Sequence, residues 1–134
     1  MKSYIIAHNT RVIQNVNKYY DPLGDYSYIF VGHRVDESLT SINSKPAIVA
    51  NYLKYNIETF PWLVAYTAWF ALVENNFIED DEWYGIFEYD VRISDTNGIT
   101  LVEKNLAIQN PLIYLVFLQG YIFYQLITKP YINS

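Results

Sequence analysis

The chain has 134 residues, of which 51% are hydrophobic and 17% are charged, and it contains no cysteine. This length fits one domain, residues 1–134, and the apolar fraction excludes disorder as the main state, because a core can offset the entropy lost on folding. The absence of cysteine excludes disulfides, thiolate nucleophiles and cysteine-ligated metals, and a net charge of -5 argues against nucleic-acid binding.

The first part of the chain alternates between strand and helix signals. A β-branched run over residues 3–8 predicts a buried strand, after which Asn9 or Thr10 provides a cap for a helix. Residues 21–25 have the composition of a turn that ends this helix. Residues 26–31 then predict a second strand, buried on both faces.

The middle of the chain predicts a loop, two helices and a third strand. Residues 36–44 are polar and predict the loop, and Pro46 favours the start of a helix that continues to residue 57. A second helix is expected over residues 61–74, where apolar side chains recur every three or four positions. An aromatic run over residues 83–87 predicts the third strand.

Strands separated by helices imply crossover connections, so the sequence predicts an α/β fold with a mostly parallel sheet flanked by helices. Ligands of such sheets bind outside the carboxyl ends of the strands. The candidate site therefore lies at three strand ends, which are residues 7–9, 32–34 and 88–90.

Two carboxylates follow the third strand, Glu88 and Asp90, and their spacing on extended backbone places both side chains on one side. Carboxylate oxygens suit Mg²⁺ or Mn²⁺, and such an ion neutralises charge on a departing diphosphate. The same acidic spacing recurs within residues 79–82, so the position directly after an apolar strand is what distinguishes this pair. A solvated turn is the alternative interpretation.

The strand that opens the chain, the second strand ending at residues 32–34, and the aromatic strand running into Glu88-Tyr89-Asp90-Val91 resemble the GT-A glycosyltransferases over residues 3–93. The resemblance implies a Rossmann-like half that binds a nucleotide-diphospho-sugar donor, for transfer to a glycan or protein acceptor. It also implies that Glu88 and Asp90 hold Mn²⁺ or Mg²⁺, although the first acidic residue of the DxD-type motif is here a glutamate.

The resemblance further implies that Ala7, His8 and Asn9 contact the nucleotide. Arg34 either pairs with the donor diphosphate, which suits the guanidinium geometry, or forms a surface ion pair with Asp36. Asp36 in turn either accepts a hydrogen bond from the ribose or base, or is solvated in its loop.

GT-A domains continue beyond the metal motif into an acceptor-binding half, whereas residues 94–134 form a short, atypical part. Glu103 is the only carboxylate beyond Asp95, so no catalytic base is assigned and a short or truncated member is expected. The apolar run 112–127 predicts either buried core or a patch that contacts a membrane surface or a second copy. It is too short and too interrupted for a membrane span, and with no signal peptide the expected location is cytoplasmic.

Trp62, Tyr66 and Trp69 recur at helical spacing and predict core packing rather than a sugar-stacking platform. The alternative function is a non-catalytic binding or assembly module, which needs no metal-dependent nucleotide binding.

Overall fold

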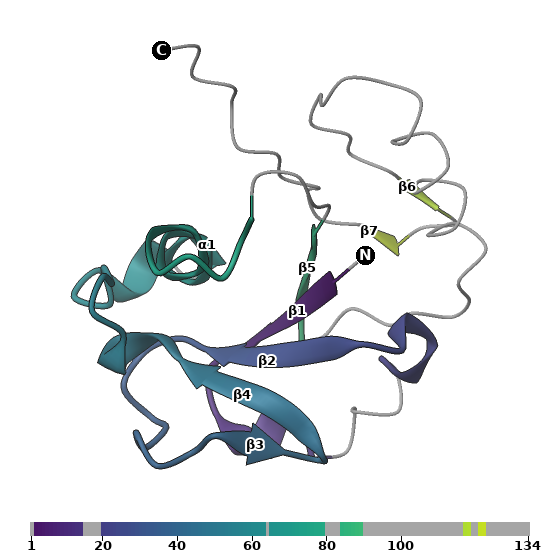
Figure 1. Ribbon diagram of the computed structural model, residues 1–134, viewed down its shortest axis with the longest axis horizontal. Coiled ribbons are helices and arrows are strands. Elements are labelled where there is room, and N and C mark those ends of the chain that lie inside the picture. The colour runs from purple at the N-terminus through teal and green to yellow at the C-terminus, as the bar shows by residue number, and fades with distance from the viewer. Residues whose placement is uncertain are drawn as a thin grey trace, which may run out of the picture.

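The computed structural model describes residues 2–14, 20–63, 65–79 and 84–89, together with the backbone of residues 117–118 and 121–122 (Figure 1). The predictions made for Asp90, for Glu103 and for nearly all of residues 94–134 lie outside these described residues.

A five-stranded sheet forms the centre of the described structure, with the spatial order β3-β4-β2-β1-β5 (Figure 1). Its strands are β1 (Lys2–Ala7), β2 (Tyr26–Phe30), β3 (Ser41–Ile42), β4 (Lys45–Val49) and β5 (Tyr84–Glu88). All neighbouring pairs are parallel except β3 with β4. The predicted α/β fold with a mostly parallel sheet is confirmed at this level.

Alternation along the central strands sends successive side chains to opposite faces of the sheet, and each face is buried. In β1, Tyr4 and Ile6 belong to one core cluster, while Ile5 and Ala7 belong to the other. This burial on both faces explains why the strands are continuous apolar runs rather than alternating ones.

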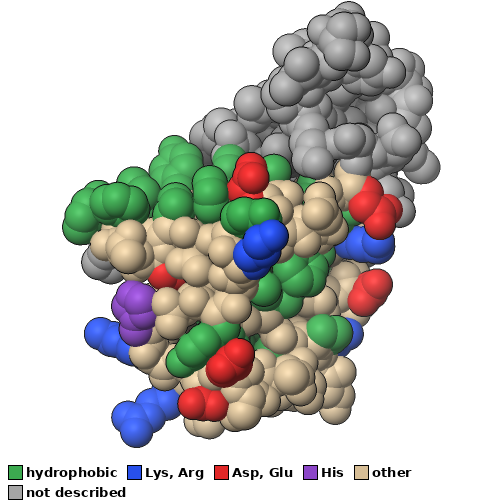
Figure 2. Space-filling view, turned by 60° about the vertical axis from the view of Figure 1, so that its left-hand side comes forward, with side chains coloured by type: hydrophobic (Ala, Val, Ile, Leu, Met, Phe, Trp, Pro, Cys, Tyr) green, Lys and Arg blue, Asp and Glu red, His purple; other side chains and the backbone are tan. Residues whose placement is uncertain are grey.

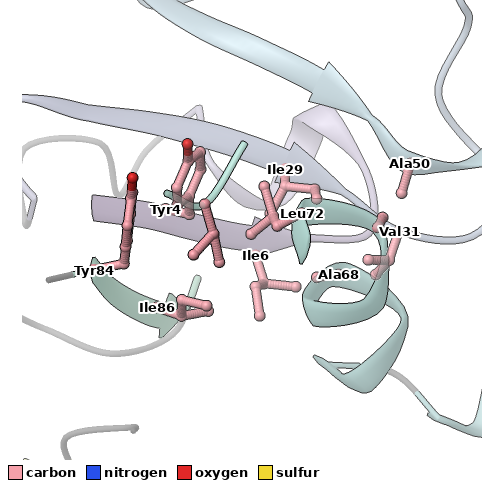
Figure 3. Close-up of a cluster of buried hydrophobic side chains, with 11 residues drawn as sticks. Tyr4, Ile6, Ile29, Val31, Ala50, Ala68, Leu72, Tyr84 and Ile86 are labelled. Atoms are coloured by element: carbon pink, nitrogen blue, oxygen red, sulfur yellow. The ribbon is translucent and has the colours of Figure 1, made fainter. Parts of the chain in front are cut away.

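Helix α1 (Ala65–Glu74) covers one face of the sheet through Ala68, Ala71 and Leu72. Figure 3 shows Leu72 and Ala68 against the side chains of the central strands, with Tyr84 and Ile86 of β5 beside them. Two short 3-10 helices, Thr10–Val12 and Asp21–Leu23, contribute to the cluster on the other face.

The helix expected from Pro46 to residue 57 is wrong. The chain forms the hairpin of β3 and β4 instead, followed by a 3-10 helix over Ala50–Tyr52. Asn43 and Ser44 at the hairpin turn both have positive φ, 52° and 60°, as the turns that match strand twist require. Part of the expected loop 36–44 is therefore strand β3.

The other helix predictions are partly confirmed. The helix expected after Asn9 is, where described, only the 3-10 turn Thr10–Val12. The second helix divides into a 3-10 turn, Pro61–Leu63, and α1. Trp69 packs partly buried against the core, but the core assignment is wrong for Trp62 and Tyr66, which are 71% and 66% exposed.

Within the apolar run 112–127, the described backbone forms an antiparallel pair, β6 (Phe117–Leu118) with β7 (Tyr121–Ile122). Among the described residues, no helix has both the length and the apolar character needed to cross a membrane.

Candidate functional site

The candidate site lies at the carboxyl ends of β1 and β5, where the direction of chain progression through the sheet reverses. From β1 the chain proceeds outward to β2 and β4, and it then returns to place β5 on the other side of β1. Both β1 neighbours are parallel to it, so the ends of all three strands lie at one edge. Open α/β sheets bind ligands at such a switch point.

His8 and Tyr89 meet at this switch point. Their rings contact edge to face, with centroids 5.2 Å apart, and both residues are half-buried. The Tyr89 N–H donates to the Ile6 carbonyl at 2.9 Å, and the Tyr20 hydroxyl donates to the Tyr89 carbonyl. Tyr89 is therefore fixed through its backbone on both sides. The sequence placed it in the strand end 88–90 but predicted a role only for the carboxylates on either side of it.

The structure assigns different tasks to Ala7 and Asn9. Ala7 is buried in the core and its carbonyl accepts the Val31 N–H at 2.9 Å, so its side chain cannot face a ligand. The Asn9 amide oxygen caps the following 3-10 helix by accepting the N–H groups of Arg11 and Val12 at 2.9 and 3.1 Å. Of the three predicted residues, His8 has a side chain that is neither in the core nor engaged in a cap.

The end of β2 is fastened to a loop that comes much later in the chain. Gly32 has a φ of 79°, and its N–H donates to a carboxylate oxygen of Glu58. Nε2 of His33 lies 3.1 Å from the Glu58 carbonyl. Glu58 is 1% exposed, and no sequence pattern marks it, because its partners come from a different strand end.

Arg34 and Asp36 are both exposed, and no ion pair joins these two described residues. Asp36 instead organises its own loop: its Oδ1 accepts the Ser38 N–H at 2.9 Å, and its carbonyl accepts the Leu39 N–H at 3.2 Å. The hydrogen bonds from Ser38 hold the pKa of the Asp36 carboxyl below its usual range. The Asp36 carboxylate is therefore charged near neutral pH and helps to hold its own loop.

Of the predicted metal ligands, Glu88 is the last residue of β5 and is half-buried, level with Ile6 of β1. Its predicted partner, Asp90, lies outside the described residues. Within the described ranges, no group of three His, Asp or Glu side chains is arranged to hold a metal ion. Glu88 does provide carboxylate oxygens, the donors that Mg²⁺ and Mn²⁺ prefer, at the edge where His8 lies.

Taken together, the edge of the sheet brings His8, Tyr89 and Glu88 to adjacent strand ends, with the Gly32–Arg34 segment on the next strand. This arrangement offers an imidazole, a phenol ring, a carboxylate and, from the neighbouring loop, an exposed guanidinium. Comparison with known proteins finds no matching family model, no matching curated protein and no matching solved structure.

Proposed function

We propose that the protein is a metal-dependent glycosyltransferase that binds a nucleotide-diphospho-sugar donor at the carboxyl ends of β1 and β5. The observation that carries the proposal is the parallel pairing of these two strands, which sets His8 and Glu88 at one edge of the sheet. The assignment to a GT-A-type fold is part of the proposal, and it rests on the sequence resemblance over residues 3–93.

Each residue of this edge has a chemical task in the proposal. Glu88, with Asp90, would hold Mn²⁺ or Mg²⁺, and the bound ion supplies electrostatic stabilisation to the leaving diphosphate. His8 and Tyr89 present a ring pair against which a nucleotide can be placed. Arg34 supplies a charged, planar donor group for phosphate oxygens.

The sheet also supports the proposal energetically. The residues at this edge of the sheet directly follow strands that are almost wholly buried. The groups that would contact a donor are therefore held on rigid elements. Positioning by such elements lowers the entropy lost on binding.

Exposed aromatic side chains favour the second candidate function, a non-catalytic binding or assembly module. Figure 2 looks toward the side of the molecule that carries α1, and hydrophobic side chains gather at the upper left of the coloured surface. Phe60 and Trp62 form an edge-to-face pair and are 45% and 71% exposed, with Tyr66 and Phe70 following on α1. Exposed apolar surface of this kind commonly marks interaction sites.

The two candidates are separated by metal-dependent nucleotide binding, measured on the double variant Glu88→Ala with Asp90→Ala. The proposal predicts that this variant keeps its fold, as judged by circular dichroism, and loses the Mn²⁺-dependent part of nucleotide binding. The matched control is Glu79→Ala with Asp81→Ala, which removes the same charge at the same spacing before β5 rather than at its carboxyl end. Equal binding by the two double variants would show that the donor site is assigned to the wrong residues.

A further inference from the structure

One residue, Glu58, joins two loops at the carboxyl edge of the sheet. It lies between the 3-10 helices that end at Tyr52 and begin at Pro61. Its own N–H donates to Asn56 Oδ1 at 3.2 Å within this loop, while its carboxylate and its carbonyl both meet residues that follow β2. The Gly32 N–H donates to its carboxylate, and the His33 ring contacts its carbonyl at 3.1 Å. Glu58 therefore holds two consecutive residues of the β2 loop through two different groups.

A carboxylate in this position is costly. Glu58 is 1% exposed, and its second oxygen, Oε1, is buried with no hydrogen-bond partner. A buried polar atom without a partner lowers stability, and nearly all such atoms in folded proteins are satisfied. The bond made by the other carboxylate oxygen explains why a carboxylate is kept here. That oxygen accepts the Gly32 N–H and so holds the loop after β2 in place.

In the loop after β2, Arg34 lies between two residues whose positions are fixed by contacts. His33 is bound to Glu58 on one side, and Val35 is 7% exposed in the core on the other. Arg34 itself is exposed, so its guanidinium projects from a backbone fixed at both ends. Gly32, with its positive φ, begins this turn, and its bond to Glu58 selects one conformation of a residue that could adopt many.

We infer that Glu58 is a positioning residue for the donor site: by accepting the Gly32 N–H it fixes the β2 loop, so that Arg34 is presented in one place at the sheet edge. The inference rests on the proposed function, because the donor diphosphate is the anion that Arg34 would meet. The inference adds Glu58, which does not lie at a strand end, to the residues of the donor site. Glu58 acts by holding the β2 loop and does not contact the ligand. Because the loop is ordered before binding, less entropy is lost when the anion is bound.

Two conservative variants of the full chain test this inference, because one changes only the charge of the Glu58 side chain and the other changes only its length. Glu58→Gln keeps the length of the side chain and an acceptor oxygen but removes the charge. Glu58→Asp keeps the charge but is one methylene shorter, so its carboxylate no longer reaches the Gly32 N–H. Exposed Glu74→Gln is the control for charge loss alone. The readouts are Mn²⁺-dependent binding of UDP and GDP by calorimetry, and hydrogen exchange of the Gly32 amide by NMR.

A positioning role predicts that Glu58→Asp binds nucleotide about tenfold more weakly, whereas Glu58→Gln stays within about threefold of the parent. The Gly32 amide should exchange about tenfold faster in Glu58→Asp and keep its protection in Glu58→Gln. The opposite order of affinities would overturn the inference, because binding would then depend on the charge of Glu58 and not on the bond to Gly32. Equal affinities in both variants and the parent would also overturn it.

Failure of the proposed function is distinguishable from failure of this inference. If the parent binds no nucleotide, the proposed function is wrong, and so is the role of Glu58 in positioning the nucleotide-sugar site, whatever the amide exchange shows. If the parent binds and Glu58→Asp leaves Gly32 protection unchanged, the fastening of the loop is wrong while the proposed function stands.

Discussion

The ring of His8 meets the ring of Tyr89 edge to face, 5.2 Å between centroids, although the two residues follow different strands. The contact depends on the parallel pairing of β1 with β5. The Tyr89 N–H extends this pairing by one more hydrogen bond, to the Ile6 carbonyl. The ring pair lies at the switch point of the sheet, where the proposed donor site is placed. The stability of the edge therefore bears directly on the proposed function.

Tyr20→Phe should loosen this edge. The Tyr20 hydroxyl donates to the Tyr89 carbonyl from a fully buried position, and removing it leaves that carbonyl without its partner. We expect the free energy of unfolding in urea to fall by about 1–2 kcal/mol. Tyr55→Phe, at an exposed tyrosine, should change it by less than about 0.5 kcal/mol. Equal losses in the two variants would contradict this role for the Tyr20 hydroxyl.

Gly85→Ala should be destabilising for a steric reason. A Cβ at Gly85 would lie 2.6 Å from Cε2 of Phe87, closer than two carbon atoms pack, and 3.1 Å from Oγ of Ser3. The expected loss in free energy of unfolding is about 1–3 kcal/mol. In a Phe87→Leu background the loss should be smaller, because leucine does not reach the same place. Strictly additive losses in the double variant would show that the Phe87 ring is not the obstacle.

Asn75→Ala should detach the loop around Tyr55 from α1. The Asn75 side chain accepts the Tyr55 N–H at 3.2 Å and donates to the carbonyls of Tyr55 and Ala71 at 2.7 and 2.8 Å. Because these bonds are partly exposed, we expect a loss of only about 1–2 kcal/mol in thermal or urea unfolding. Asn75→Asp keeps the acceptor for the Tyr55 N–H but places a carboxylate oxygen against the carbonyls of Tyr55 and Ala71 at the end of α1, so it should be at least as destabilising as alanine. An alanine variant as stable as the parent would refute the prediction.

The fold should lose stability at alkaline pH through Tyr26. Burial raises the pKa of Tyr26 above its ordinary value of 10.0. The unfolded chain therefore releases this proton at a lower pH than the folded chain, so the stabilisation is complete below pH 10 and declines as the pH rises beyond it. Tyr26→Phe should remove one late-ionising phenol from the absorbance titration and flatten the decline in stability. A titration with the same late step in the variant would assign that step to another tyrosine.

The sequence predicts the parts of the fold whose pattern is local. β1, β2 and β5 are apolar runs bounded by turn residues, and α1 repeats its apolar positions with helical spacing, so each was expected close to its observed place. The sheet follows from their alternation with helical segments.

The errors arise where a tertiary contact decides the outcome. Residues 45–49 were expected in a helix because of Pro46, but pairing with β2 and the Asn43-Ser44 turn make them strand β4. Trp62 and Tyr66 have helical spacing, yet the spacing does not say which side of the helix meets the sheet. Glu58 was missed because its function depends on Gly32, which is distant in sequence.

The measurement that tests the central claim most directly is calorimetric titration of the full chain with UDP, GDP and their common sugar conjugates, with and without Mn²⁺. The proposed donor site at the ends of β1 and β5 predicts saturable binding of one nucleotide series that requires the metal. The absence of binding to every nucleotide, in a sample shown to be folded by circular dichroism, would contradict the glycosyltransferase proposal and favour the binding or assembly module.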